Sequence, residues 1–491
     1  MEKLRNRLCP ACRHHRCGFI VWPMTLTSSR RVLRLWPRKS RVIYSEICKV
    51  QFYPQALQLA LIGFIFFAIA CYPGFMSPDS LDQYKQAHSL KFADWHPPVM
   101  AWLWSKLNSL LDGPHGLLFL HLGLLWGGVY IWRRYAGENR VANWFVLLGF
   151  SPWVANFEGA LWKDVGMAFS LLLALGLLRK KKLAGPQVFL SMSLVLYAFM
   201  VRANAPAAVA PILWYASWRL FPMLLSWARM AITILSLALM FVFLNFFNYF
   251  LLDAEKNHID SFMMIDDLVH LSAVADKNLL PRADANTVKK CSQEMVGGIK
   301  LVGKYFCLKT EPSYRNVAVI PYEEVKEAWL SAVTSNPLEC LKFRFNAFFQ
   351  LLRNPSEKPH MHWCPGIIPN EIGLIQKDNF ATILLKVYIN GVAYCFPFLF
   401  KPYWWLILAM LYLCATFIMQ GDKDSLRLIR VLLVSALLYM FSYVPLAATP
   451  DFRYVYWSTI ATSLAVITYA TSNLNFRRDL HNVPTKFRIN F

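Results

Sequence analysis

The amino-acid sequence predicts an all-α polytopic membrane protein with a small external insert. Of its 491 residues, 56% are hydrophobic and 16% are charged, whereas about a quarter of the residues of a soluble domain are charged. Apolar runs of roughly 17–23 residues recur along the chain, which is the length of helix that crosses a bilayer. Basic residues gather in one terminal arm and in short loops between the apolar runs.

We expect roughly ten to twelve transmembrane or re-entrant helices. The predicted spans cover residues 56–72, 116–132, 141–156, 159–178, 188–201, 205–218, 230–251, 403–419, 431–445 and 455–471. Residues 382–400 contain Lys386, Asn390 and Pro397. We interpret this segment as interfacial or re-entrant, because a full crossing would place the basic loop 422–430 outside.

The charge distribution sets the expected topology. The formal net charge is +22, and residues 1–50 carry 12 Lys and Arg against two acids. By the positive-inside rule the N-terminus is cytoplasmic, and the loop 73–98 lies outside. Because the excess charge follows the predicted loops, it favours membrane lipids and no nucleic acid as partners.

The chain divides into five expected parts. They are a basic cytoplasmic arm (1–50), a transmembrane block with the first external loop (51–252), an external soluble insert (253–378), a second transmembrane block (379–475) and a cytoplasmic tail (476–491). The insert holds 15 Lys and Arg against 16 Asp and Glu and has amphipathic stretches. We therefore expect it to be small and helical.

Cysteines and histidines raise three smaller questions. Four cysteines lie in the expected external insert, where one or two disulfides are plausible and the pairing stays open: Cys291, Cys307, Cys340 and Cys364. The spacing of Cys9, Cys12 and Cys17 resembles half of a zinc site, but without a second CxxC a basic tail is favoured. Residues 359–364, with two histidines and Trp363, are interpreted as a loop at the membrane surface.

The first external loop concentrates groups that carry chemistry. Pro78 stands at a predicted helix start with Ser77 as candidate N-cap, and Asp79 falls in the first turn. Asp79 alone is explained by the helix dipole. That explanation leaves out Asp82 one turn later and His96 before two prolines at the end of the loop. Such a set can accept a proton or bind a divalent cation.

This loop resembles that of the GT-C superfamily of integral-membrane glycosyltransferases. The resemblance rests on an Asp-containing loop directly after the first span, a helix that bears Tyr84 a few residues on, and the His96-Pro-Pro element. It is nearest to bacterial members that use polyprenyl-phosphate-linked sugars, the protein-mannosyltransferase-like and lipid A aminoarabinose-transferase-like families. In those families the acidic residue of this loop is catalytic, and Asp79 matches it. Many members have an adjacent second acid, where this chain has Ser80.

Residues in three further external loops suit a lipid-phosphate substrate. Lys163 and Asp164 open the fourth predicted span, where an interfacial anchor is the alternative. Arg202 lies between two short spans, where it either snorkels or binds an anion. Arg453 and Tyr454 precede the last span, and this pair resembles the donor-phosphate element of the family.

The sequence therefore predicts a glycosyltransferase in a bacterial inner membrane, multi-pass, with its active site on the periplasmic face. It would move a sugar from a polyprenyl-phosphate donor to a lipid-linked glycan, a cell-envelope polymer or a protein. The predicted catalytic residues are Asp79, Asp82 and His96, and the predicted substrate- or phosphate-binding residues are Tyr84, Lys163, Asp164, Arg202, Arg453 and Tyr454. Asp79 and Asp82 are the candidate ligands of a divalent cation (Mg, Mn or Zn), and no other cofactor is expected.

Two other functions fit parts of the same pattern. A transporter or a lipid flippase would need polar groups at mid-bilayer depth, and the predicted spans are nearly free of charge. A scaffold without catalysis would leave the external Asp and Arg residues replaceable. A site on one face of the membrane favours the enzyme.

Overall fold

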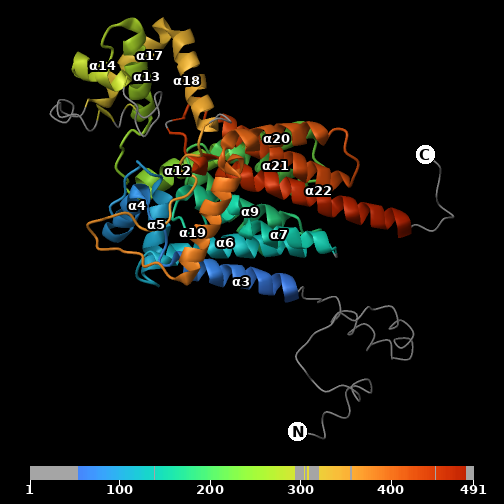
Figure 1. Ribbon diagram of the computed structural model, residues 1–491. Coiled ribbons are helices and arrows are strands. Elements are labelled where there is room, and N and C mark those ends of the chain that lie inside the picture. Colours follow the sequence, from blue (N-terminus) through green and yellow to red (C-terminus); the bar gives the residue numbers. More distant parts are fainter. Residues whose placement is uncertain are drawn as a thin grey trace, which may run out of the picture. The chain divides into compact units, whose positions relative to one another are not determined.

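Helices make up the regular structure of the described residues (Figure 1). The computed structural model describes residues 54–137, 139–293, 304, 307–308, 320–353, 357–447 and 449–482, with the backbone alone for 474–482. The basic arm, including Cys9, Cys12 and Cys17, and the end of the tail (483–491) lie outside the described residues. The chain divides into two units, Met1–Tyr53 and Pro54–Phe491, so the two predicted membrane blocks and the insert belong to one unit.

The N-terminal block follows the predicted apolar runs closely, with one exception. Its long helices are α3 (Pro54–Cys71), α6 (His115–Arg134), α9 (Lys163–Leu178), α10 (Gly185–Met200), α11 (Ala205–Leu220) and α12 (Ser226–Asn245), which continues as the π-helical turn η5 (Phe246–Leu251). Two shorter helices, α4 (Pro78–Ser89) and α5 (Pro98–Asn108), occupy the predicted first external loop.

The exception is the predicted span 141–156, which is wrong as a single helix. The segment breaks into η3 (Arg140–Asn143), α7 (Trp144–Leu147), η4 (Leu148–Phe150) and α8 (Pro152–Ala155). Ser151 is extended before Pro152, because a residue that precedes proline is pushed out of the α region. Apolar composition alone did not reveal this break.

The centre of the N-terminal block is α9, whose side chains are almost all buried. It packs against α6, α10 and α22, which fits a helix that is apolar on all sides. The indole of Trp132 on α6 donates to the backbone carbonyl of Leu172 at 2.8 Å. This buried hydrogen bond satisfies the Trp132 donor inside the core.

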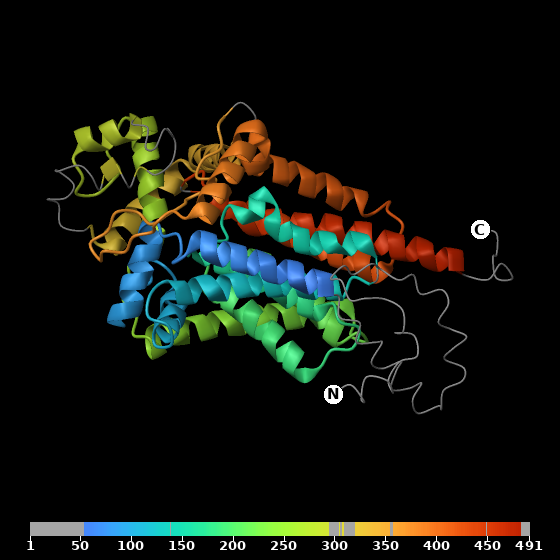
Figure 2. The ribbon, with the colours of Figure 1, turned by 60° about the horizontal axis from the view of Figure 1, so that its bottom comes forward.

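The C-terminal block contains α19 (Phe380–Cys395), η6 (Pro397–Phe400), α20 (Pro402–Ala415), α21 (Lys423–Phe441), η7 (Phe452–Val455) and α22 (Tyr456–Asn482). Figures 1 and 2 both show α3 and α22 running along a common direction. In Figure 1, α19 runs across that direction and meets the end of α3, where Thr382 donates to the carbonyl of Ala70 at 2.7 Å. The interfacial or re-entrant interpretation of 382–400 stays a prediction.

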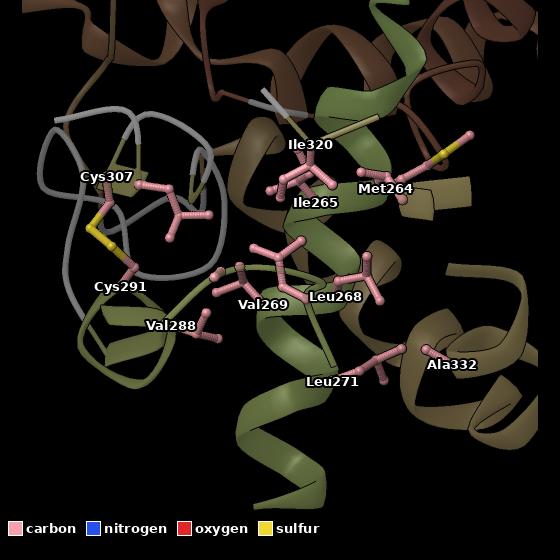
Figure 3. Packing of buried hydrophobic residues seen from close by; sticks show 14 of the residues in the cluster. Met264, Ile265, Leu268, Val269, Leu271, Val288, Cys291, Cys307, Ile320 and Ala332 are labelled. Atoms are coloured by element: carbon pink, nitrogen blue, oxygen red, sulfur yellow. A yellow bond between two sulfur atoms is a disulfide. The ribbon is translucent and has the colours of Figure 1, made fainter. Parts of the chain in front are cut away.

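The insert is helical where it is described, as expected. It holds α13 (Asp260–Ala275), α14 (Ala285–Gln293), α17 (Tyr322–Ser335) and α18 (Pro337–Leu352). Apolar side chains from these helices form their own core, shown in Figure 3, with Leu268 and Val269 of α13 at its centre. Of the four cysteines, Cys291 and Cys307 form a disulfide, while Cys340 and Cys364 are free.

Large apolar side chains cover the outside of several helices. Two helices of the described chain are long and apolar enough to cross a membrane, His115–Arg134 and Ser226–Leu251, and four shorter apolar ones accompany them. Only 11% of the apolar window of Ser226–Leu251 is buried inside the protein. The expected number of membrane crossings stays a prediction, and this outward apolar surface is the observation that bears on it.

We expect the disulfide to carry much of the stability of the insert. Replacing both Cys291 and Cys307 by Ser opens a loop of 16 residues, which costs about 3 kcal/mol in the chain-entropy account. Limited proteolysis of the intact chain should then cut the insert more than tenfold faster. Cys414→Ser, which removes a free and exposed thiol, is the matched control and should leave the rate unchanged. Equal rates in both variants would show that the disulfide contributes nothing.

Candidate active site

Three segments far apart in the sequence form a small backbone frame under the site. Phe75 exchanges backbone hydrogen bonds of 2.7 and 3.0 Å with residues 159–161. Met76 does the same with residues 366–368, at 2.9 and 3.2 Å. The loop after α3, the loop before α9 and the end of the insert are thus joined through their backbones.

Two glycines allow this close approach. Gly74 has φ of +127°, and a Cβ there would lie 2.5 Å from Leu161. A Cβ on Gly159 would lie 2.6 Å from the sulfur of Cys71. A side chain at either position would therefore force the facing side chain, Leu161 or Cys71, to shift.

The first turn of α4 follows directly after this frame and lies at the site. Pro78 occupies the first turn of α4 after an extended Ser77, as the sequence predicts. The Ser77 hydroxyl does not cap the helix, because it accepts a hydrogen bond from the Trp162 indole at 2.8 Å. Ser80 donates to the carbonyl of Leu161 at 2.9 Å. The first turn of α4, which carries Asp79, is therefore tied to the loop before α9.

Asp79 is held by two residues from distant parts of the chain. Its Oδ2 accepts a hydrogen bond from the Arg453 guanidinium at 2.7 Å. Its Oδ1 lies 3.8 Å from Nε2 of His96, longer than a hydrogen bond. The Asp79 side chain keeps 30% exposure, so the carboxylate is partly accessible.

His96 connects Asp79 to Lys163. The Lys163 ammonium lies 2.5 Å from Nδ1 of His96. Burial and the charge of Lys163 lower the pKa of His96 to about 3, so the imidazole is neutral at physiological pH. A neutral ring that accepts at Nδ1 carries its proton on Nε2, which faces Asp79.

Asp79 is ionised at physiological pH. Burial by itself raises the pKa of Asp79, but Arg453, Lys163 and His96 outweigh it and hold this pKa well below its usual value. Opposite charges within a few ångströms favour the ionised carboxyl. The site therefore presents a carboxylate whose charge is retained over the whole physiological pH range.

Arg202 forms the second half of the cluster. Its guanidinium pairs with Asp164 at 3.1 Å and donates to the hydroxyl of Tyr443 at 2.6 Å. The Tyr454 ring lies 5.0 Å from the Arg202 guanidinium and 5.3 Å from that of Arg453. Such cation–π distances let one ring link the two arginines.

Seven of the predicted site residues thus gather in one cluster, and two do not. The cluster contains Asp79, His96, Lys163, Asp164, Arg202, Arg453 and Tyr454. Asp82 is exposed and its carboxylate accepts a hydrogen bond from Gln86. Tyr84 is buried against the Trp104 ring, with centroids 5.1 Å apart. Asp82 and Tyr84 therefore lie outside the cluster.

The cluster does not have the composition of a divalent metal site. Oδ2 of Asp79 is taken by a guanidinium, and Lys163 and Arg202 add two further positive side chains. Among the described residues, no group of three His, Cys, Asp or Glu side chains is arranged to hold a metal ion. The residues present therefore do not fit the cation that Asp79 and Asp82 were expected to share.

Sequence reasoning missed three members of the cluster: Tyr443, His360 and Asp451. Tyr443, just after α21, stacks on Tyr454 with centroids 5.0 Å apart. His360 lies 3.3 Å from Asp451, whose other oxygen pairs with Arg453 at 3.1 Å. The segment 359–364, predicted as a surface loop, thus reaches the site. In the sequence, only the two histidines of this segment indicated a functional role. The contact of His360 with Asp451 could not be predicted, because it depends on the fold.

A cavity of about 170 Å³ lies beside Arg202. Apolar side chains of α10 and α12 form much of its lining, among them Phe199, Met200, Phe241 and Leu244. Asp94 lines it too, and accepts from the Tyr249 hydroxyl at 2.8 Å. The cavity combines an apolar wall with one cationic and one acidic side chain, Arg202 and Asp94.

Comparisons with known proteins add little to this geometry. No protein-family model matches the chain, and no curated protein sequence matches it. Among solved structures it is similar to the archaeal oligosaccharyltransferase AglB from Archaeoglobus fulgidus, solved with an inhibitory peptide and a dolichol-phosphate. The identity is 12% and the TM-score 0.37, over 88% of this chain and 52% of that chain. This chain spans about half the length of AglB, and a match at this level decides neither its fold nor its activity.

His96 makes the stability of the protein depend on pH. In the unfolded chain His96 takes up a proton near its ordinary pKa of 6.5, whereas the folded protein resists this down to about 3. The unfolded state binds more protons in this window, so the free energy of unfolding falls as pH drops, by up to about 1.4 kcal/mol per pH unit. The lowered pKa of Asp79 acts in the same direction, but only below its ordinary value of 3.8.

We expect His96→Gln to flatten this dependence. Thermal unfolding of the purified protein at about pH 7 and about pH 5 should show a smaller loss in the variant than in the wild type. His88→Gln changes an exposed histidine and should keep the wild-type slope. An unchanged slope in His96→Gln would mean that His96 titrates as it does in the unfolded chain.

Proposed function

We propose that this chain is a membrane glycosyltransferase of the GT-C type. It would move a sugar from a polyprenyl-phosphate donor to a hydroxyl group of an acceptor at the external leaflet. The observation that carries the proposal is the partly exposed Asp79 carboxylate inside a cluster with Lys163, Arg202 and Arg453. One site thus contains both a carboxylate that can accept the proton of the acceptor hydroxyl and cationic side chains that can bind the leaving phosphate.

The membrane setting is supported by the outward apolar surface. Side chains on α12 such as Ile234, Leu239 and Val242 are each more than half exposed. A soluble protein rarely exposes so continuous an apolar face, whereas lipid covers it without cost. Large apolar side chains are exposed on α20 as well, among them Leu411 and Ile407.

A lipid-linked phosphate is supported by Lys163 and by the cavity. Each arginine of the cluster pairs with a carboxylate, while the described hydrogen bond of the Lys163 ammonium goes to the neutral imidazole of His96. An ammonium has three donors, so Lys163 has donors to offer a phosphate. The apolar cavity beside Arg202 suits a hydrocarbon chain attached to that phosphate.

In the proposed reaction the acceptor oxygen attacks the anomeric carbon of the sugar. The bond from that carbon to the phosphate oxygen breaks, and its electron pair stays on the phosphate. Lys163, Arg202 and Arg453 stabilise the charge that develops there. The acceptor proton passes to Oδ1 of Asp79. Because the pKa of Asp79 is low, this transfer comes late, and the first task of Asp79 is to orient the acceptor hydroxyl.

We expect Asp79→Asn to abolish transfer. Asn keeps the size of the side chain but removes the charge that accepts the proton, and general-base groups contribute about 10²–10⁴-fold to rates. The measurement is transfer of radiolabelled sugar from a panel of polyprenyl-phosphate sugars to membrane extracts.

Asp82→Asn is the matched control, since it makes the same change on the same helix outside the cluster. It should keep wild-type activity. Equal activity in Asp79→Asn and the wild type would refute the proposed site. Flipping of labelled lipid without sugar transfer would favour a flippase instead.

We also expect transfer to persist in excess EDTA. The cluster supplies its positive charge from Lys163, Arg202 and Arg453, and its donor set does not fit a divalent cation. Activity is measured before and after chelation, and again after Mg²⁺ or Mn²⁺ is added back. Loss of activity that either metal restores would contradict this prediction.

A further inference from the structure

The helix α18 of the insert is apolar on two separate faces. One face is buried and includes Phe343, Ala347 and Leu351. The other is exposed and consists of Leu338, Leu341, Phe345 and Phe349, at 78%, 52%, 42% and 60% exposure. We name these four residues the α18 stripe.

The α18 stripe is one continuous line on the helix surface. Its members are spaced by three, four and four residues, which places them on the same side of an α-helix. Lys342 and Asn346 are exposed on an adjoining side. The exposed part of α18 therefore has a sharp boundary between an apolar and a polar side.

The C-terminal end of α18 meets the membrane block at its apolar surface. Phe348 packs against Phe441 of α21, with ring centroids 6.1 Å apart, and α18 also contacts α20. Phe441 is itself 42% exposed. Phe349 of the stripe lies beside buried Phe348, with ring centroids 6.4 Å apart, so the stripe adjoins the exposed apolar surface of α21 at this contact.

The direction of α18 differs from that of the membrane helices. In Figure 1, α18 runs across the direction of α20, α21 and α22, and its C-terminal end lies at the end of these helices. A helix placed so would lie along a leaflet surface when the other helices cross it. Interfacial helices have this arrangement, with large apolar side chains on one side and polar ones on another.

We propose that the α18 stripe lies in the external leaflet and holds the insert against the lipid surface. The proposal rests on the membrane setting of the proposed function. The occupant of the stripe is the acyl boundary of the bilayer, because the stripe adjoins the exposed apolar surface of α21 through Phe349, Phe348 and Phe441.

This contact has a consequence for the site. The insert reaches the cluster through His360, which lies 3.3 Å from Asp451, and through residues 366–368, which pair with Met76. Anchoring α18 therefore sets the height of these segments relative to the leaflet. The acceptor and the donor phosphate would meet Asp79 at that height.

The test is photocrosslinking of the full chain in nanodiscs made of phosphatidylethanolamine and phosphatidylglycerol. A benzophenone amino acid replaces Phe345 in one protein and Asn346 in another, which moves the probe from the stripe to the polar side of the same helix. A third protein carries the probe at Leu239, on the outward face of α12. Lipid adducts are counted by mass spectrometry of the α18 and α12 peptides.

We expect the yield of lipid adducts at 345 to exceed that at 346 by about fivefold or more, and to approach the yield at 239. Adducts at 239 with none at 345 would overturn the proposal and leave the membrane setting intact. Chain-to-chain adducts at 345 would overturn it in favour of a second copy as occupant. If 239 also fails to label with lipid, the membrane setting and the proposed function fail together.

Discussion

The ion pair between Arg453 and Asp79 is the interaction on which the rest of the site depends. It joins residues that are 374 positions apart, at 2.7 Å. Arg453 reaches Asp79 because its guanidinium also pairs with Asp451 and lies 4.8 Å from the ring of Trp162. The loop before α22 and the loop after α3 must both be in place before this contact can form. Breaking this partly buried pair would leave an uncompensated charge on either residue, which favours the paired geometry.

The positive and negative side chains of the cluster balance each other. The three cations Lys163, Arg202 and Arg453 are matched by Asp79, Asp164 and Asp451. Partly buried charges cost free energy unless they are paired and hydrogen-bonded. Both arginines meet that condition through carboxylates, whereas the ammonium of Lys163 is hydrogen-bonded to neutral His96. A phosphate would complete the hydrogen bonding of Lys163.

Both ends of the insert are tied to the first external loop. Near its beginning, Asp94 accepts a hydrogen bond from the backbone of Asn257 at 2.6 Å. Near its end, residues 366–368 pair with Met76. The insert has a core and a disulfide of its own (Figure 3), so it acts as a brace whose two ends meet the segment that carries Asp79. Its position against the lipid would thereby affect the site.

Composition and charge placement determined much of this protein: helices along the apolar runs, a helical insert, and polar residues collected in the loops. The lengths of apolar runs and their helical spacing are local features of the sequence, so helices can be predicted from them without knowledge of the fold. The break in 141–156 has a local cause at Pro152, which apolar composition did not reveal. The separation of Asp82 and Tyr84 from the cluster and the contacts of Tyr443 and His360 could not be predicted. These features depend on which loops meet, and only tertiary packing decides the distance between residues hundreds of positions apart.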